Sequence, residues 1–433
     1  MRELFRSRNY KLLFFGSLVS ELGNVLFSFA AGLYVADLTG KASLLGLFMA
    51  LGAGTRILLS PLAGVFVDRW NRVRIIYVTD YLRGVIFVAT AVLFMSEPSA
   101  ETATWVLLVV AVLSGTIASL FTPAVTAAIP EIVGLDQVQQ ATGANNIVFS
   151  MTQIFGIVLG MVAFGLFPFH IAVLINGISF LLSGFSEMFI RTPHKEEAPP
   201  APQAGFFADF KGGLQYLVKR QGLLTLMIFS LFMNFAIAPL MSVGIPALFR
   251  IELGRSVWEI GWPSIAFSAS AAVAGIVIGS MAIKRLAVAI RNGLALLVLS
   301  FVMMTLIIYL LDIGFLSYWV FYGLFIVANI GMAFFMVATN VPLNTGLIKV
   351  IEPNMRGRVF AAISALAGAA TPVAVLLGGV VIDATNVTVL ALICSVLLLI
   401  PAIGFVFNKK VKGLFDGIER DNNAMAEAAK LQA

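Results

Sequence analysis

The sequence predicts an all-α membrane protein with twelve transmembrane helices. Its 433 residues are 60% hydrophobic and only 12% charged, whereas a soluble protein carries about 25% charged residues. The apolar residues form long runs; residues 137–186, for example, contain no Asp, Glu, Lys or Arg. Because a helix of roughly 20 residues crosses the ~30 Å hydrocarbon core of a bilayer, these runs indicate repeated membrane crossings.

Charged residues and turn signals divide the chain into the individual spans. Residues 137–186 must hold two helices, because this stretch is far longer than one crossing at ~1.5 Å per residue. The turn GLFPFH at 165–170 marks the break between them. The predicted spans are 11–36, 43–67, 74–96, 102–128, 141–165, 169–190, 221–248, 258–283, 291–311, 315–345, 358–381 and 387–408.

The distribution of Lys and Arg predicts the orientation of these spans. With the N-terminus in the cytoplasm, most of the 28 Lys and Arg residues fall in cytoplasmic segments, and Lys41, Arg250 and Arg255 fall in outer loops. Positively charged loops stay on the cytoplasmic side during insertion. We therefore expect a multi-pass protein of the cell (inner) membrane with both termini in the cytoplasm. Membrane topology then accounts for the net charge of +6. No nucleic-acid partner is expected.

A polar interruption after the sixth span divides the chain. Pro and charged residues in RTPHKEEAPPAPQAG, residues 191–205, predict an extended linker. Residues 206–220 have the pattern of an amphipathic helix that lies along the inner membrane surface. The predicted parts are an N-terminal six-helix bundle (1–190), a cytoplasmic linker with this helix (191–220), a C-terminal six-helix bundle (221–410) and a cytoplasmic tail (411–433).

The two halves resemble each other at their fourth spans. TPAVT contains Pro123 and VPLNT contains Pro342, at corresponding points of the two halves. Parallel six-helix halves around a central cavity are a known plan among membrane proteins. We therefore predict two pseudo-symmetric six-helix bundles.

A dense charged turn, GVFVDRWNRVR at 64–74, connects the second and third spans. Its pattern G-x-x-x-D-R-x-x-R-x-R resembles the signature loop motif of the major facilitator superfamily. The resemblance covers residues 1–410 and implies the major facilitator fold. The motif is carried by Gly64, Asp68, Arg69, Arg72 and Arg74.

The resemblance implies a gating role for this loop. Gly64 is expected to let the second helix approach a neighbour closely, and Asp68 to pair with basic groups and a helix N-terminus at the inner face. Such a cluster would hold the two halves together in the outward-open state. The alternative is that Arg69, Arg72 and Arg74 are ordinary positive-inside anchors.

Shorter motifs resemble the drug:proton antiporter branch of this superfamily, which includes macrolide-efflux and siderophore-exporting proteins. They are SELGN (20–24), LLSPLAGVFVDR (58–69), Asp80-x-x-Arg83, SLFTPA (119–124) and PNMRGRVFA (353–361). The fifth span departs from the branch, because its Gly-Pro step reads Gly156-Ile157, with Gly160 following. These glycines still permit close helix packing.

Ionisable residues inside the spans are costly in a bilayer and mark functional positions. Glu21 and Arg56 lie at nearly equal depth on the two arms of a hairpin whose tip is near Thr39. They are expected to pair across the hairpin or to flank one polar cavity. Two roles remain for Glu21: a desolvated carboxyl that takes up a proton outside and releases it inward, or a structural partner of Arg56 or Arg83.

Further charged residues lie closer to the predicted inner face. Asp80 and Arg83, at i and i+3, are interpreted as a structural charge pair, with a functional role as the alternative. Glu187 is followed by Arg191 at i+4 and is interpreted as a snorkelling surface pair.

Two asparagines are predicted to line the cavity. Asn24 adjoins Glu21 on one helix face, and Asn234 lies at comparable depth in the seventh span. An aromatic wall with few charges near this site would suit lipophilic substrates. The aromatic residues expected there are Phe27, Phe232 and Phe235.

Other classes of function lack the residues they need. Cys394, His170 and His194 make no metal-ligand cluster, so no metal, cofactor or catalytic residue is expected. The sequence has no G-x-x-x-x-G-K-[ST] loop, which excludes ATP-driven pumping. An intramembrane enzyme or a non-transporting receptor stays as the remote alternative.

The resemblance and the buried charges together lead to one hypothesis. The protein is expected to be a monomeric secondary active transporter that exports lipophilic or amphiphilic small molecules, of the multidrug or macrolide type. It would work by proton antiport and alternating access. A siderophore, metabolite or lysophospholipid exporter of the same fold is the alternative.

Overall fold

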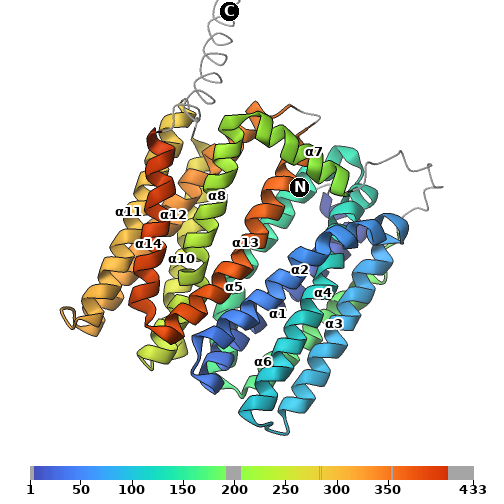
Figure 1. The fold of residues 1–433 in the computed structure, drawn as a ribbon. Helices are drawn as coiled ribbons and strands as arrows, with labels where there is room; N and C mark the ends of the chain where they lie inside the picture. The colour runs from blue at the N-terminus through green and yellow to red at the C-terminus, as the bar shows by residue number, and fades with distance from the viewer. Residues whose placement is uncertain (1–3, 192–205, 282, 284, 353–354, 408–433) are drawn as a thin grey trace, which may run out of the picture. The chain divides into compact units, whose positions relative to one another are not determined.

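A computed structural model describes residues 4–191, 206–281, 283, 285–352 and 355–407 (Figure 1). Within these residues, twelve helices are long and apolar enough to cross a membrane, so the predicted all-α fold with twelve spans is confirmed. His194, most of the linker 191–205 and the tail 411–433 lie outside the described residues.

The spans of the first half follow one another with short connections. They are α1 (Arg8–Thr39), α2 (Ala42–Arg69), α3 (Arg72–Phe94), α4 (Ala100–Val133), α5 (Val138–Leu166) and α6 (Phe169–Glu187), with the short helices η1 (Leu4–Arg6) before α1 and η2 (Leu135–Gln137) before α5.

The second half begins with α7 (Phe206–Lys219). Its first span, Gln221–Glu252, is interrupted by two π-helical turns. The elements of this half are α8 (Gln221–Pro239), η3 (Leu240–Gly244), α9 (Ile245–Ala247), η4 (Leu248–Glu252), α10 (Val257–Ser280), α11 (Leu286–Asp312), α12 (Tyr318–Val350), α13 (Arg356–Ala384) and α14 (Val387–Phe407).

The chain divides into two compact units that do not coincide with the two halves of the sequence. Unit 1 comprises Met1–Gln203, Ser242–Gly261 and Val375–Ala384, and unit 2 comprises Ala204–Met241, Trp262–Ala374 and Thr385–Ala433. The three boundaries inside spans fall within a few residues of Pro239, Pro263 and Pro372. Each of these spans contributes its two ends to different units, and a proline, a residue that removes a helix hydrogen bond, lies near each of the three boundaries.

Polar side chains cap three of the six spans of the first half, α1, α3 and α4. The side chains of Ser7, Asn71 and Ser99 each accept one hydrogen bond from the main-chain amide three residues further along the chain, at 3.3, 2.9 and 3.3 Å. Each cap satisfies a main-chain amide that the first turn leaves free, an interaction that contributes about 1 kcal/mol. The sequence therefore sets where these helices begin.

Small residues let the helices of unit 1 pack closely. A Cβ added at Gly156 would lie 2.6 Å from the Cβ of Val25, and one at Gly160 would lie 3.1 Å from the carbonyl oxygen of Leu26. These glycines of α5 therefore pack directly on α1, as the sequence predicts. Large apolar side chains elsewhere are exposed, for example Leu58 at 73%, as expected of a surface that faces lipid.

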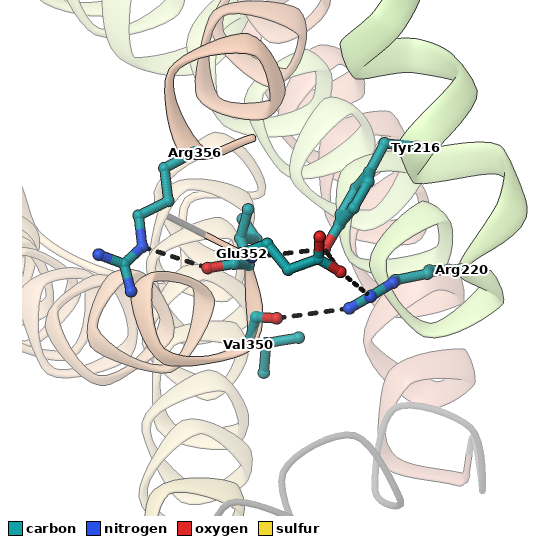
Figure 2. Close-up of polar contacts among 6 residues, drawn as sticks. Tyr216, Arg220, Val350, Glu352 and Arg356 are labelled. Atoms are coloured by element: carbon teal, nitrogen blue, oxygen red, sulfur yellow. Dashed lines mark hydrogen bonds and ion pairs between the residues drawn. The ribbon is translucent and has the colours of Figure 1, made fainter. Parts of the chain in front are cut away.

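In unit 2, α7 is fixed to the loop between α12 and α13 (Figure 2). Arg220, which follows α7, forms an ion pair with Glu352 at 2.5 Å. The main-chain amide of Glu352 donates to the hydroxyl of Tyr216 at 3.4 Å, and Arg356 donates to the carbonyl of Ile351. The ion pair is exposed, so it contributes about 0–1 kcal/mol. Tight packing provides the rest of the attachment, since a Cβ at Gly213 would lie 2.2 Å from the carbonyl oxygen of Arg358.

We expect Gly213→Leu to detach α7 from α13, because the added side chain would meet main-chain atoms that no rotamer change can move. Trypsin should then cleave at Lys211 or Lys219 several-fold faster than in the unchanged protein. Gly212→Leu is the matched control, since a Cβ there would meet only the Arg358 side chain at 3.8 Å. Equal cleavage of the two variants would contradict this account of how α7 is held.

Candidate functional site

Glu21 lies in the middle of α1 and is partly buried. It accepts a hydrogen bond from Asn24 Nδ2 at 3.4 Å, so the two side chains lie on one face of the helix as the sequence predicts. No ion pair joins Glu21 to Arg56 among the described residues, and Arg56 is exposed. Arg83 of α3 and Arg56 of α2 are both near enough to act on the charge of Glu21.

Arg83 is buried in the core of unit 1, with 6% of its surface exposed. Its guanidinium carbon lies 5.3 Å from the ring centroid of Phe121 and 5.1 Å from that of Phe180. Asp80 is fully buried on the same helix, but within the described part of the chain the two side chains form no ion pair. Aromatic faces, rather than a direct carboxylate contact, surround the cation.

The interpretation of Glu187 as a snorkelling surface residue is wrong. Its side chain is fully buried at the end of α6. A Cβ added at Gly16 of α1 would lie 3.0 Å from Glu187 Oε1. Helix α6 packs its polar face against a glycine of α1, so the carboxyl turns inward, whereas Arg191 is exposed and its main-chain amide donates to Asn9.

The charged turn between α2 and α3 is organised mainly by local contacts. Asn71 caps α3, and Arg72 forms an ion pair with Glu131 and donates to the carbonyl of Ala127 at 3.2 Å. Arg72 therefore ties α3 to the end of α4. Arg69 and Arg74 are exposed, and the side chain of Asp68 lies outside what the structure describes.

Gly64 does not make the close helix contact that the motif suggests. No described atom lies within 4 Å of the position that its Cβ would take. Helix α2 approaches neighbours closely at other positions: a Cβ at Gly46 would lie 2.9 Å from the carbonyl oxygen of Val375, and the carbonyl oxygen of Gly52 would lie 2.6 Å from a Cβ at Gly115 of α4. The small residue that matters for the α2–α4 crossing is thus on the facing helix.

One of the residues predicted near the site, Phe27, has different surroundings, and two others are exposed. Phe27 is 5% exposed, and its ring lies 4.7 Å from that of Phe87 in the core of unit 1, so it does not form part of an aromatic wall. Asn234 is exposed in unit 2, and its Nδ2 donates to the carbonyl of Ser230 at 2.9 Å. Phe232 is 43% exposed on the same helix.

Unit 1 contains a set of polar contacts that the sequence analysis did not single out, and we call it the outer clasp. Arg250 of η4 donates from Nε and Nη2 to the two carboxylate oxygens of Asp37 in α1. Asp383, at the end of α13, accepts from the main-chain amides of Ala42 at 2.7 Å and Ser43 at 3.1 Å. The clasp thus joins both helices at the tip of the α1–α2 hairpin to segments from the second half of the sequence.

Each part of the outer clasp has a clear electrostatic basis. A bidentate Arg–carboxylate pair is among the stronger charge-assisted contacts. A carboxylate at a helix N-terminus satisfies free amides and interacts favourably with the helix dipole; here Asp383 caps α2, whose own N-cap residue, Lys41, makes no capping bond. The packing is also close, since a Cβ at Gly379 would lie 2.4 Å from the carbonyl oxygen of Ala42.

A signal for Asp383 was present in the sequence. It is the only charged residue between 359 and 408, and such a lone acid between two spans marks a position that needs a partner. The partner itself, an amide pair more than 300 residues away in the chain, could not be identified from sequence spacing.

The family description "Major Facilitator Superfamily" matches residues 13–347, more than half of the chain. The chain belongs to the Major Facilitator Superfamily. It is a multi-pass secondary transporter of small molecules and not an enzyme.

Similar proteins include two from bacteria. The uncharacterized facilitator YkuC of Bacillus subtilis (strain 168) is 22% identical over 379 residues, which cover 82% of this chain and 81% of that protein. Macrolide efflux protein A of Streptococcus pyogenes is 22% identical over 275 residues, which cover 63% of this chain and 67% of that protein.

Solved facilitator structures share the fold. A bacterial homologue of the iron transporter ferroportin in an inward-facing state has a TM-score of 0.73 at 15% identity, covering 93% of this chain and 98% of its own. A D-xylose–proton symporter has a TM-score of 0.69 at 16% identity, covering 95% and 99%. At these identities the likeness concerns the fold alone.

Proposed function

We propose that this facilitator exports lipophilic or amphiphilic small molecules, of the macrolide type, in exchange for protons. The observation that carries the proposal is Glu21, a partly buried carboxyl in the middle of α1 whose one hydrogen bond among the described residues comes from Asn24. A carboxyl at membrane depth costs free energy, so its presence there marks a functional position. The likeness to macrolide efflux protein A supports the choice of substrate class.

In this mechanism Glu21 is the coupling carboxyl. When the substrate path faces outside, Glu21 takes up a proton; when the path faces inside, it releases that proton, and a cationic or amphiphilic substrate competes for the freed charge. Asn24 donates its hydrogen bond to the carboxylate and thereby orients it. Asn234 and Arg56 are proposed to line the same path.

Alternating access requires that contacts at one end of the molecule form while contacts at the other end break. We propose that the outer clasp closes the outer end and that the turn at Gly64–Arg74, with Asp68, closes the cytoplasmic end. This assignment places both termini in the cytoplasm and treats the protein as a monomer. Arg72, which is engaged with Glu131, then serves mainly to fix the start of α3.

Glu21→Gln tests the proposal in everted membrane vesicles that carry an imposed proton gradient, with a macrolide and the lipophilic cation ethidium as probes. Gln keeps the size of the side chain but binds no proton, so gradient-driven transport should fall to the level of vesicles without the protein. Glu101→Gln, at an exposed position in the first turn of α4, is the matched control and should transport normally.

Unchanged transport by a well-expressed Glu21→Gln protein would remove this residue from the mechanism. Substrate class is tested separately by comparing the compound sensitivity of cells with and without the gene. Sensitivity to macrolides or lipophilic cations supports the proposal, whereas a selective effect on a siderophore, a metabolite or a lysophospholipid would replace the substrate class.

A further inference from the structure

A polar seam runs through the apolar interior of unit 1, along one face of α6. Its residues are spaced by three or four positions, which places them on the same side of a helix. They are 0%, 7%, 1% and 0% exposed, in the order Asn176, Ser179, Ser183 and Glu187.

Glycines of α1 make room for this seam. A Cβ at Gly23 would lie 2.1 Å from Ser179 Oγ, and one at Gly16 would lie 3.1 Å from Ser183 Oγ. Polar groups so enclosed have no access to lipid or bulk water, and each one that lacks a partner costs free energy. The enclosed seam therefore lowers the stability of the fold.

Two acids meet at one end of the seam. The carboxyl of Asp80, from α3, lies beside the carboxyl of Glu187 and the hydroxyl of Ser183. Asp80 and Glu187 are both fully buried. In the described part of the chain, none of the four carboxylate oxygens and neither Ser183 Oγ nor Arg83 Nε has a hydrogen bond of regular geometry.

The charges around these acids do not balance. The charged groups that act on the pair from the packed helices are Glu21 of α1 and Arg83 of α3, and Arg56 of α2 acts in turn on Glu21 and Arg83. Together with Asp80 and Glu187 they make three carboxyls against two guanidiniums, and Arg56 is exposed. A buried carboxylate without a compensating charge costs several kcal/mol, so the group takes up a proton instead. Two carboxyls that share one site retain one proton between them in this way.

We propose that Asp80 and Glu187 together hold one exchangeable proton, with Arg83 as their fixed counter-charge, and form a second proton-binding site. This inference rests on the proton exchange proposed above. Release occurs when the cytoplasmic end opens and admits water: one carboxyl O–H bond breaks and the proton passes to that water, after which the pair carries both negative charges, one of which Arg83 offsets. No electron is transferred.

The positions along the helices fit a route that leads inward from Glu21. Counted from the predicted cytoplasmic end of α1, Glu21 lies roughly 20 Å in, and counted along α3, Arg83 lies roughly 17 Å and Asp80 roughly 12 Å in. Asp80 is therefore closer to the cytoplasm than Glu21, and the buried cation lies between the two acids. A proton that leaves Glu21 would reach the pair before it reaches the inner face.

Infrared spectroscopy of the purified full-length protein in lipid tests the proposal without any substrate. The probe is the C=O stretching band of a protonated carboxyl, followed as the pH is raised from neutral. One component of this band should disappear in the Glu187→Gln variant, and the same component should disappear in the Asp80→Asn variant. Either change leaves a single carboxylate opposite Arg83, and that carboxylate stays ionised because its charge is balanced. The double variant should lose no more than either single variant, which is the signature of one shared proton.

The controls separate this site from Glu21 and from misfolding. Glu21→Gln should keep the component. The exchange variant Asp80→Glu with Glu187→Asp keeps both carboxyls and should keep the component too, which shows that its loss in the amide variants is not a loss of fold. A component that survives both single amide changes, or no protonated-carboxyl band in the unchanged protein, would overturn the proposal. Loss of proton-driven export in Glu21→Gln alongside such a result would leave the proposed function standing.

Discussion

Cross-linking of Asp37→Cys to Arg250→Cys is expected to stop transport almost completely, and reduction of the cross-link is expected to restore it. The two native side chains form a bidentate pair between α1 and η4, so a short reducible bis-methanethiosulfonate reagent spans the two cysteines. If the outer clasp must open in every cycle, a covalent bond there holds the transporter in one state. Macrolide and ethidium transport in vesicles measures the effect, and the fraction cross-linked is read from a gel.

Several controls fit this experiment. The native Cys394 is 1% exposed and should not compete for the reagent. Each single-cysteine variant should keep its transport after treatment, and the double variant should transport before the reagent is added. Normal transport by fully cross-linked protein would show that this end of the molecule does not open during the cycle.

Gly115→Leu is expected to prevent folding of the first six helices. A Cβ at Gly115 would stand 2.6 Å from the carbonyl oxygen of Gly52 and 3.2 Å from the Cβ of Thr55, so α2 and α4 could not keep their crossing. Overpacking a tight site typically costs ~1–3 kcal/mol, and a clash with main-chain atoms belongs at or above the upper end of that range. Membrane expression and the melting temperature of the purified protein are the measurements.

The matched control is Gly323→Leu in α12. Gly323 is exposed on its helix, and no described atom lies within 4 Å of its added Cβ. This variant should express and melt like the unchanged protein. Similar loss in both variants would mean that the membrane-embedded glycines act through helix propensity, which differs by about 1 kcal/mol between Gly and Ala, and not through the α2–α4 contact.

Residues whose role depends on one helix were predicted well from sequence. Glu21 and Asn24 lie three positions apart and do form a hydrogen bond, because helix geometry alone brings such residues together. Close packing of α5 through Gly156 and Gly160 was also predicted, because a small side chain on a spanning helix lets another helix approach, although the sequence did not say that α1 would be that helix. The expected roles of Glu21 and of the charged turn stay predictions.

Residues whose role depends on the facing helix were predicted poorly. Glu187 has a basic residue at i+4, and this local pattern favoured a surface pair, yet the carboxyl is buried beside Asp80. Gly64 carries the family motif without a close contact to any described atom, while Gly115 makes a close contact without belonging to a motif. Phe27, expected to face a substrate path, packs against Phe87. Each error arises because sequence spacing defines a helix face but not the helix that covers it.

The sequence by itself determined the number of spans and their approximate limits, because hydrocarbon thickness and the cost of unpaired backbone groups leave apolar helices as the solution for such a chain. The charged turn at 64–74 indicated the family. The tertiary structure alone decided which polar groups meet in the interior. Asp80 with Glu187, Asp37 with Arg250, and Asp383 with the start of α2 join residues of different helices. A bilayer requires only that the surface of each helix facing lipid is apolar, and this requirement does not specify such pairs. They are specified by the way in which the helices pack against one another.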